Sequence, residues 1–385
     1  MSTTAARGFV AGGLACGIKE SGAPDLALVA TDDHAPVPAA AVFTSNLAQA
    51  APVQVSRAHL ANGHAAAVIL SSGNANAATG ESGRRDARRM CELAAEGIHA
   101  ATADILVCST GLIGIPMPMS ALEAVIPKIC GTLSREGGAD AAQAMLTTDT
   151  VRKEAIAAAG NAIVGGMAKG AAMRSPAMAT MLALLTTDAA ADPPVLRQAL
   201  AQAVSETFDC LSVDGCRSTN DTVIVLANGR AGSVDPAQLT DALTEVCGSL
   251  AEQMARDAEG ATKLVRVKVV GARTRGEAQV AARAVANSQL VQCSLNGGDA
   301  YWGRVISELG ASGAFIEPER VDIAYNGITV CRDGVACDHD AVALATHMAG
   351  RELELRCDLH LAHGEATILT TDLSHAYIDE NRRTS

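Results

Sequence analysis

Hydrophobic and polar residues alternate in two late segments of the chain, residues 263–269 and 353–361. Alternation with a period of two predicts strands that bury one face and leave the other in water. Several shorter runs are continuously apolar between Gly, Asn, Ser or Asp residues, which predicts buried strands covered on both faces. These runs are residues 66–70, 105–108, 181–185 and 222–226.

Helices are predicted where a capping residue precedes apolar residues at helical spacing. Asp192 stands before two prolines and an amphipathic stretch, and Asp235 stands before one proline and a longer stretch, which predicts two helices. Ser120 and Glu123 have the spacing of a capping box for a third helix, which Pro127 should kink or shorten. Since these elements alternate without a sequence repeat, we predict a layered α/β sandwich.

Length and composition indicate a globular protein with a large core. The 385 residues would suit two to three domains of about 150 residues. Hydrophobic residues make up 49% of the chain and aromatic residues only 2%, so the core is built from Ala, Val, Leu and Ile and the chain is too apolar for disorder. Residues 187–194 are the only plausible linker, and because they are short we expect the two halves to pack on each other.

The charge and the cysteines narrow the function classes. A net charge of −12 without a concentrated basic stretch argues against a nucleic-acid partner. The 11 cysteines are scattered and never spaced as C-x-x-C, which indicates reduced thiols and a cytoplasmic protein. The N-terminal residues predict no signal peptide, and no apolar run reaches the roughly 18 residues that a membrane span needs.

Common catalytic and cofactor motifs are weak. The Gly-rich turns at Gly73 and Gly111 complete neither a dinucleotide nor a P-loop fingerprint, so no cofactor is expected. Cys337, His360 and His363 fit no zinc spacing, and surface histidines are the better interpretation, so no metal is expected. No G-x-S-x-G elbow supports a Ser-His-Asp triad.

Thr180 stands between a turn of small residues and a hydrophobic strand, and this position allows two interpretations. It is a β-branched residue that starts a strand, or it is a self-processed nucleophile whose hydroxyl attacks the Ala179 carbonyl. Cleavage would leave Thr180 with a free α-amine of pKa about 7.7–8.0, which can act as base for its own hydroxyl. Thr110 and Gly111 would offer a hydroxyl and a backbone N–H to the developing oxyanion.

Residues 169–182 closely follow the self-cleavage motif of the ornithine acetyltransferase family, also called the glutamate N-acetyltransferase family, which this chain resembles over nearly its whole length. Further matches to that family are spread in order along the chain. They include residues 42–46, 72–76, 109–111, 147–150, 218–222, 259–264, 286–288 and 302–304.

The resemblance implies an α/β fold of the layered αββα type. It implies cleavage between Ala179 and Thr180 into an α chain of residues 1–179 and a β chain of residues 180–385, which stay associated, usually as an α2β2 heterotetramer. It also implies a ping-pong reaction, in which Thr180 takes acetyl from N2-acetyl-L-ornithine and passes it to L-glutamate.

The resemblance further assigns roles to particular residues, for which structural alternatives such as turn capping or a salt bridge stay open. Thr180 is the nucleophile, and Thr110 and Gly111 form the oxyanion hole. The substrate-binding residues are Thr147, Lys169, Glu259, Asn381 and Ser385. The implied partners are small amino-acid substrates.

Departures from the family pattern keep other functions open. Ala177 replaces the usual Asn of the cleavage motif, and the tail from Asn381 to Ser385 is one residue short and unusually basic. The alternatives are a paralogue with a different acyl donor or amine acceptor, an amidohydrolase that uses the same nucleophile, and a relative that only binds an amino acid.

Overall fold

The computed structural model describes residues 3–170 and 181–382, and the chain forms two compact units. The N-terminal unit comprises Met1–Asp209 and Cys216–Met254, and the C-terminal unit comprises Cys210–Gly215 and Ala255–Thr384. Two sheets belong to the N-terminal unit and one to the C-terminal unit, and each unit has its own hydrophobic core.

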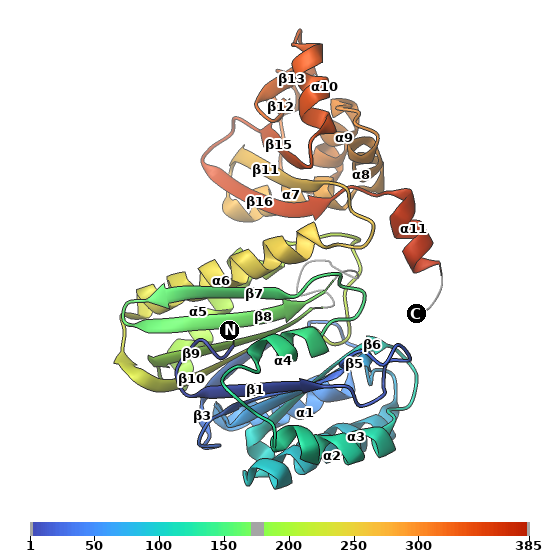
Figure 1. The fold of residues 1–385 in the computed structure, drawn as a ribbon. Coiled ribbons are helices and arrows are strands. Elements are labelled where there is room, and N and C mark those ends of the chain that lie inside the picture. Colours follow the sequence, from blue (N-terminus) through green and yellow to red (C-terminus); the bar gives the residue numbers. More distant parts are fainter. Residues whose placement is uncertain (1–2, 171–180, 383–385) are drawn as a thin grey trace. The chain divides into compact units, whose positions relative to one another are not determined.

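Two sheets stacked face to face form the N-terminal unit (Figure 1). The first sheet has the order β1 (Phe9–Leu14), β2 (Leu26–Thr31), β5 (Ala67–Asn74) and β6 (Ile105–Leu112). The second has the order β4 (His64–Ala65), β3 (Val37–Phe43), β10 (Thr222–Ser233), β9 (Leu182–Ala190), β8 (Ala162–Lys169) and β7 (Lys153–Ala159). Buried residues from both sheets, mostly Ala, Val, Leu and Met, form one core cluster between them.

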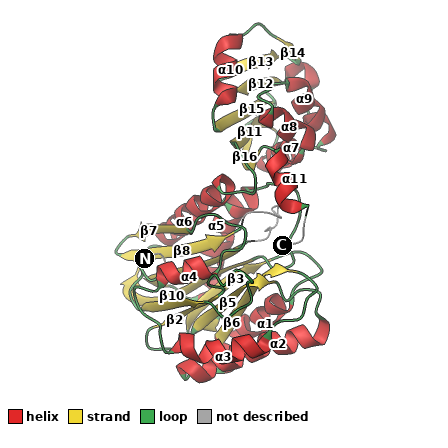
Figure 2. Ribbon diagram, turned by 45° about the vertical axis from the view of Figure 1, so that its right-hand side comes forward, coloured by secondary structure: helices red, strands yellow, loops and turns green. Residues whose placement is uncertain are grey.

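Helices cover the outer face of each sheet, so the unit has the predicted αββα layers (Figure 2). The first sheet packs against α1 (Ala51–His59), α2 (Gly80–Ile98) and α3 (Met119–Cys130). The second sheet packs against α5 (Pro193–Glu206) and α6 (Pro236–Arg256), whereas α4 (Gly138–Ala144) contributes to the core between the sheets. Gly166 lets α6 lie close to β8, because a Cβ there would meet Val246 and Leu250.

A single mixed sheet with helices packed against it forms the C-terminal unit. Its order is β14 (Val335–Ala336), β13 (Ile328–Arg332), β12 (Asp322–Tyr325), β15 (Glu352–Asp358), β11 (Leu264–Ala272) and β16 (Gly364–Thr371). Its core is shared with α7 (Arg275–Asn287), α8 (Gln289–Asn296), α9 (Trp302–Ala311) and α10 (Ala341–Ala349), and α11 (His375–Asn381) follows the last strand. Val265, Val267 and Val269 are buried, as the predicted alternation requires.

Short 3₁₀ helices complete the described elements: Leu60–Asn62, Thr102–Asp104, Phe208–Cys210 and Pro318–Arg320. None of the helices that the structure describes is both long enough and apolar enough to cross a membrane.

The predicted buried strands are confirmed as β5, β6, β9 and β10, but the predicted linker at residues 187–194 is wrong. Thr187 and Asp188 belong to β9 and are buried. The Asp188 carboxylate accepts hydrogen bonds from the Ile163 N–H and the Arg7 guanidinium. Because the Asp188 carboxylate is hydrogen-bonded at the sheet, Thr187 and Asp188 belong to the strand and not to a linker. The boundary between the two units falls instead after Asp209 and after Met254.

The start of the third predicted helix is also wrong. Helix α3 begins at Met119 with Pro118 at its N-cap, so Ser120 lies inside the helix and caps nothing. The helix continues past Pro127 to Cys130, and the proline removes only the hydrogen bond that its own N–H would donate.

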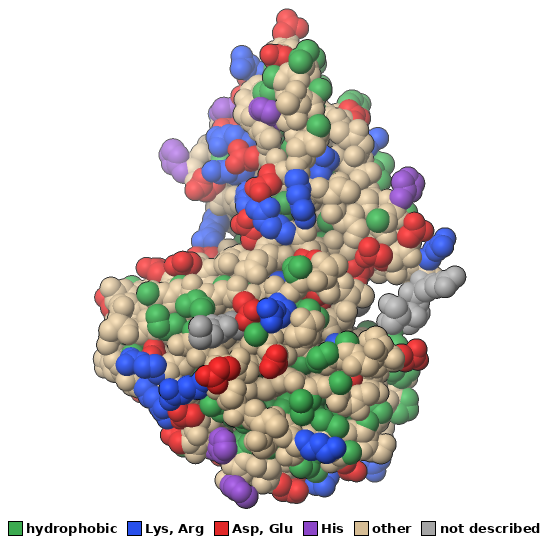
Figure 3. Space-filling model, viewed as in Figure 1, with side chains coloured by type: hydrophobic (Ala, Val, Ile, Leu, Met, Phe, Trp, Pro, Cys, Tyr) green, Lys and Arg blue, Asp and Glu red, His purple; other side chains and the backbone are tan. Residues whose placement is uncertain are grey.

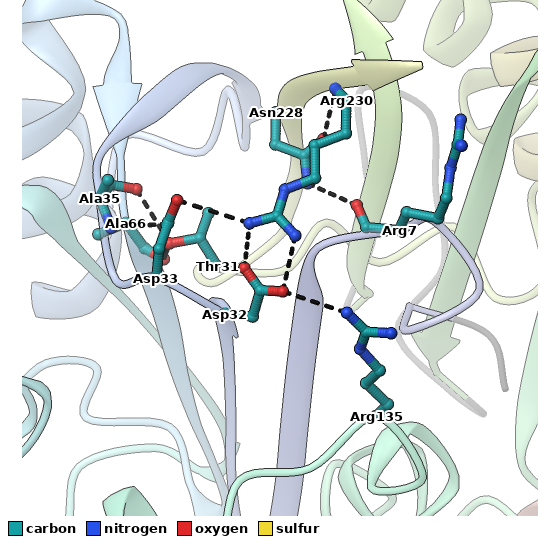
Figure 4. Close-up of polar contacts among 9 residues, drawn as sticks. All are labelled: Arg7, Thr31, Asp32, Asp33, Ala35, Ala66, Arg135, Asn228 and Arg230. Atoms are coloured by element: carbon teal, nitrogen blue, oxygen red, sulfur yellow. Dashed lines mark hydrogen bonds and ion pairs between the residues drawn. The ribbon is translucent and has the colours of Figure 1, made fainter.

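Charged side chains tie the two sheets of the N-terminal unit together at one end (Figure 4). Asp32 follows β2 and pairs with both terminal nitrogens of Arg230 on β10, and Arg135 lies 3.4 Å from the same carboxylate. Partial burial would raise the pKa of Asp32, but the two guanidinium groups lower it below its usual range. On the face shown in Figure 3, blue Lys and Arg side chains similarly lie mostly beside red Asp and Glu side chains.

We expect Asp32→Asn to lower the free energy of unfolding at pH 7 by about 1 kcal/mol, because a bidentate pair at a partly exposed site is lost. Since the pKa of Asp32 is lowered in the folded protein, this stabilisation is present above the usual Asp range and is lost as pH falls through the lowered pKa. Urea unfolding at pH 7 and pH 3 measures both effects. The exposed Asp241→Asn on α6 is the control, and an equal loss in both variants would contradict the expectation.

Candidate active site

The carboxyl ends of the parallel strands β5 and β6 approach each other so closely that Gly111 is required. Gly111 has a φ of +132°, and a Cβ at this position would overlap the carbonyl carbon of Gly73 and the nitrogen of Asn74. Thr110 beside it is buried, with 2% of its surface exposed, whereas Gly111 is exposed. The backbone of the two predicted oxyanion residues is therefore fixed by the neighbouring strand.

Lys169, on the second sheet, contacts Thr110 at this end of the first sheet. It is the last residue of β8, only 2% of it is exposed, and its Nζ donates a hydrogen bond to the Thr110 Oγ1 at 3.2 Å. The sandwich thus places two predicted site residues, from different sheets and 59 positions apart in the sequence, in direct contact. Because the ammonium donates to the hydroxyl oxygen, the hydroxyl proton remains free for another acceptor.

The buried carboxylate of Asp149 binds several of the residues around Lys169. Its carboxylate accepts hydrogen bonds from Lys153 Nζ at 2.6 Å, from the Gly170 N–H at 2.7 Å and from the Thr147 N–H at 3.2 Å. Lys169 Nζ lies 4.0 Å from the same carboxylate. Thr147, a further predicted site residue in this unit, therefore joins the cluster through its backbone.

The charges around Asp149 keep it ionised. Burial alone would raise the pKa of Asp149, but the charges of Lys169 and Lys153, with the hydrogen bonds from Lys153 and the Gly170 N–H, hold it well below its usual range. The Lys169 ammonium beside Thr110 is the kind of group that binds an anion such as a substrate carboxylate.

Ala179 and Thr180 lie outside the described residues, but the chain that follows them is well anchored. Leu182 pairs with Lys169 in the antiparallel ladder of β8 and β9. Met181 N–H donates to Asp221 Oδ1 at 2.8 Å, and the Thr222 N–H donates to the Met181 carbonyl at 3.1 Å. The residue after the predicted nucleophile therefore lies at the same end of the sheet as Lys169.

The C-terminal unit brings together the other two described candidates. Asn381 on α11 donates from Nδ2 to Glu259 Oε2 at 2.7 Å. Among the described residues, Glu259 has no cationic partner, so the predicted alternative of a helix-end salt bridge does not apply to that part of the chain. Burial and the charge of Glu259 raise the pKa of Glu380. Ser385 lies outside the described residues.

The loop that carries Glu259 is fixed by the segment that leads into α11. Gly260 has a φ of +63°, and a Cβ there would overlap the Tyr377 N–H. Ser374 Oγ donates to the Gly260 carbonyl at 2.5 Å, and the Asp372 carboxylate accepts from the N–H of Thr262 at 2.8 Å and of Lys263 at 2.7 Å. Glu259 is thus presented by a rigid turn.

Sequence reasoning gave no role to Asp149, Lys153, Asp221 or Asp372. Asp149 lies in a matched family segment, residues 147–150, and Lys153 follows at helical spacing. A carboxylate followed by two lysines, one at each side of the largely apolar residues 154–168, could have suggested the buried pair. Across the described part of the chain, no group of three His, Cys, Asp or Glu side chains could hold a metal ion.

Fold and site together define a layered α/β enzyme whose polar cluster lies at the ends of two facing sheets. The ArgJ family profile matches residues 10–384. The chain is 44% identical to the "Arginine biosynthesis bifunctional protein ArgJ" of Thermobifida fusca, over 99% of each chain. It is 45% identical to the protein of the same description from Streptomyces coelicolor, also over 99% of each chain.

The chain belongs to the ArgJ family. The predicted family resemblance and the predicted enzyme class, an N-acyltransferase, are thereby confirmed. A solved structure from Mycobacterium tuberculosis, described as ornithine acetyltransferase complexed with ornithine, is 39% identical over 46% of this chain and 94% of that one, with a TM-score of 0.42.

We expect Gly111→Ala to disrupt the junction of β5 and β6, because its Cβ has no space and its φ is strained. Strain of this kind costs about 1–3 kcal/mol, so the free energy of unfolding should fall by at least this amount, and acyl transfer should be lost. Gly114→Ala is the matched control, since Gly114 also has a positive φ, +84°, but has open space around it. Equal activity in the two variants would contradict the steric argument.

We expect Asp149→Ala to destabilise the N-terminal unit by about 3–5 kcal/mol, because it leaves the Lys153 ammonium buried without its partner. Asp149→Leu combined with Lys153→Met should recover much of that stability, since the pair is then replaced by apolar groups. Chemical denaturation of both variants measures the difference. A double variant no more stable than Asp149→Ala would show that the buried charge is not the cause.

Proposed function

We propose that the chain transfers an acetyl group from N2-acetyl-L-ornithine to L-glutamate through an acetyl ester on Thr180, after cutting itself between Ala179 and Thr180. The observation that carries the proposal is the buried hydrogen bond from the Lys169 ammonium to the Thr110 hydroxyl. It lies at the end of the sheet where β9 begins, one residue after Met181. The contact places a cationic group beside the hydroxyl that is predicted to bind the oxyanion.

Self-cleavage prepares the nucleophile. The Thr180 hydroxyl adds to the Ala179 carbonyl, the peptide C–N bond breaks, and the acyl group is left as an ester that water hydrolyses. The products are the α chain of residues 1–179 with a new carboxylate and the β chain of residues 180–385 with a free α-amine. That amine can take the proton of its own hydroxyl, so no histidine is needed.

Acetyl transfer then proceeds in two halves. The Thr180 hydroxyl attacks the acetyl carbonyl of the donor while the α-amine takes its proton. The amide C–N bond of the donor then breaks, and the proton leaves on the amine of ornithine. The α-amine of glutamate next attacks the ester and releases Thr180. In both halves the Thr110 hydroxyl, polarised by the Lys169 ammonium, and the Gly111 N–H donate to the oxyanion.

Each unit, taken by itself, carries a charged group that suits such substrates. The Lys169 ammonium, with Thr147, suits the α-carboxylate that donor and acceptor share. Glu259, with Asn381 and Ser385, suits the side-chain ammonium of ornithine, because its carboxylate has no cationic partner among the described residues. Association of the fragments as an α2β2 heterotetramer and action in the cytoplasm complete the proposal.

A paralogue with another acyl donor or acceptor is the second candidate. It is favoured by the unusually basic tail after Asn381, which carries Arg382 and Arg383. Incubation with N-acetylornithine and a panel of amines, followed by mass analysis of the products, separates the two. Acetate release at a rate that does not depend on added amines would instead indicate an amidohydrolase.

Thr180→Ala should abolish both self-cleavage and transfer, and denaturing mass analysis should show one intact chain in place of two fragments. Thr110→Ala should slow transfer by about 10²–10³-fold, as the loss of one oxyanion donor does, and Thr102→Ala, in the 3₁₀ helix that precedes β6, is its control. An intact wild-type chain with no acetyl exchange under any condition would refute the proposal.

A further inference from the structure

A cavity of about 240 Å³ lies at the outer edge of strand β3, and the proposed reaction does not use it. Its walls come from β3, from α1 with the 3₁₀ helix that follows it, and from α5, all in the N-terminal unit. Two of the lining residues are arginines, Arg57 and Arg197, and none is acidic. In a chain with a net charge of −12, such a cavity is a local concentration of positive charge.

The edge of β3 that borders the cavity is not covered by another strand of the described chain. Strand β4 pairs with only the first two residues of β3, and the Ala39 N–H then donates to the Gly63 carbonyl at 2.8 Å. The backbone groups of successive residues alternate between the two edges of a strand, so the N–H groups of Ala41 and Phe43 lie on the same outer edge. Neither N–H has an acceptor among the residues that the structure describes.

Arg57 is held at the cavity by the anchoring of α1 on the first sheet. The neighbouring Ser56 Oγ donates to the Val107 carbonyl at 2.6 Å and accepts the Val107 N–H at 2.7 Å. The Arg57 guanidinium stacks on the Phe43 ring, 4.8 Å from its centroid. A stacked guanidinium keeps its N–H groups in its own plane, where they can bind an anion.

Arg197 reaches the cavity through the packing of α5. Gly63 has a φ of +74°, and a Cβ there would meet the Pro193 ring, so the turn before β4 lies directly against the start of α5. Arg197 follows Pro193 by four residues, which puts both on one face of the helix. Arg84 and Arg89 on α2 each have a glutamate partner. Arg57 and Arg197 have no carboxylate partner within the described part of the chain.

The size and the chemistry of the cavity indicate the class of ligand. Each guanidinium can bind one carboxylate through two N–H groups. The two arginines stand on helices that cover different sheets, so they suit two separate negative groups, and the alanine side chains of β3 suit a short hydrocarbon chain. Because a water molecule occupies about 30 Å³, the cavity holds about eight water-sized groups, which matches a short dicarboxylate and excludes a nucleotide.

We propose that this cavity is a second binding site, which takes a short dicarboxylate. One carboxylate pairs with Arg57 and the other with Arg197, and the N–H groups of Ala41 and Phe43 donate to the ligand from the strand edge. The cavity shares no lining residue with the cluster around Lys169, so the inference goes beyond the proposed function and does not depend on it.

Chemical modification of arginine tests the site on the whole chain. The protein is treated with phenylglyoxal, with and without glutarate at constant ionic strength, and the modified residues are mapped by mass analysis. Saturating glutarate should slow modification of Arg57 and Arg197 by about 10-fold or more, because their N–H groups are then bound. The exposed Arg275, in the C-terminal unit, should react at an unchanged rate. Unchanged rates at Arg57 and Arg197 would overturn the proposal.

A variant tests whether the two arginines bind the same ligand. In Arg197→Gln, the glutarate concentration that half-protects Arg57 should rise by about 10-fold to 100-fold, as the loss of a hydrogen bond between charged groups predicts. Arg275→Gln is the matched control and should leave that concentration unchanged. Equal protection of Arg57 in both variants would show that Arg197 does not share its ligand, which contradicts the proposed site.

Two further probes separate other occupants of the cavity. Inorganic phosphate is one compact anion, and an extended peptide of alternating Glu and Val can add a strand to the open edge of β3. Glutarate should protect Arg57 and Arg197 at a lower concentration than either probe. Protection by phosphate at the same concentration would indicate a general anion site, and stronger protection by the peptide would indicate strand docking. Either result would overturn the assignment to a dicarboxylate.

Discussion

The buried carboxylate of Asp149 is the constraint around which the site is arranged. Three donors bind it, and one of them is the ammonium of Lys153, which is itself fully buried. Taking these charges out of water is costly unless each finds its partner, so the start of β7, the end of β8 and the turn at Thr147 must meet at one point. Lys169 is oriented towards Thr110 as a consequence.

Small residues allow the strands and a helix of the N-terminal unit to pack closely. Gly111 lets β6 lie close to the backbone of β5 at Gly73, and Gly166 lets α6 lie close to β8. The core between the sheets is rich in Ala, and each Ala buries little surface, so stability depends on many modest contacts spread over both sheets. Because these side chains are small, they also leave room for polar groups such as Asp149 and Asp221 to be buried in the same unit.

Much of the fold followed from local pattern. The apolar runs that became β5, β6, β9 and β10 are long enough and well enough bounded to define strands, and Asp192 and Asp235 marked two helices. The failures came where polar side chains are satisfied by distant partners. Thr187 and Asp188 looked like a linker because their bonds to Ile163 and Arg7 come from other parts of the chain.

The site residues that could be predicted from the sequence are those that lie in family motifs. Lys169, Thr110 and Thr147 were singled out, and the structure brings them together. Asp149, Lys153 and Asp221 act through contacts across strands, which no local pattern shows. The division of the chain into two compact units was likewise not visible, because Asp209 and Met254 stand in ordinary sequence.

The order of strands in the second sheet has a consequence for the chain if it is cut between Ala179 and Thr180, as proposed. Strands β9 and β10, which follow residue 180, lie between β3 on one side and β8 on the other, which precede it. After cleavage the two fragments would therefore be interleaved within one hydrogen-bonded sheet. They could not separate or exchange with other copies without unravelling that sheet, so the severed chain should remain a single molecule for as long as its N-terminal unit stays folded.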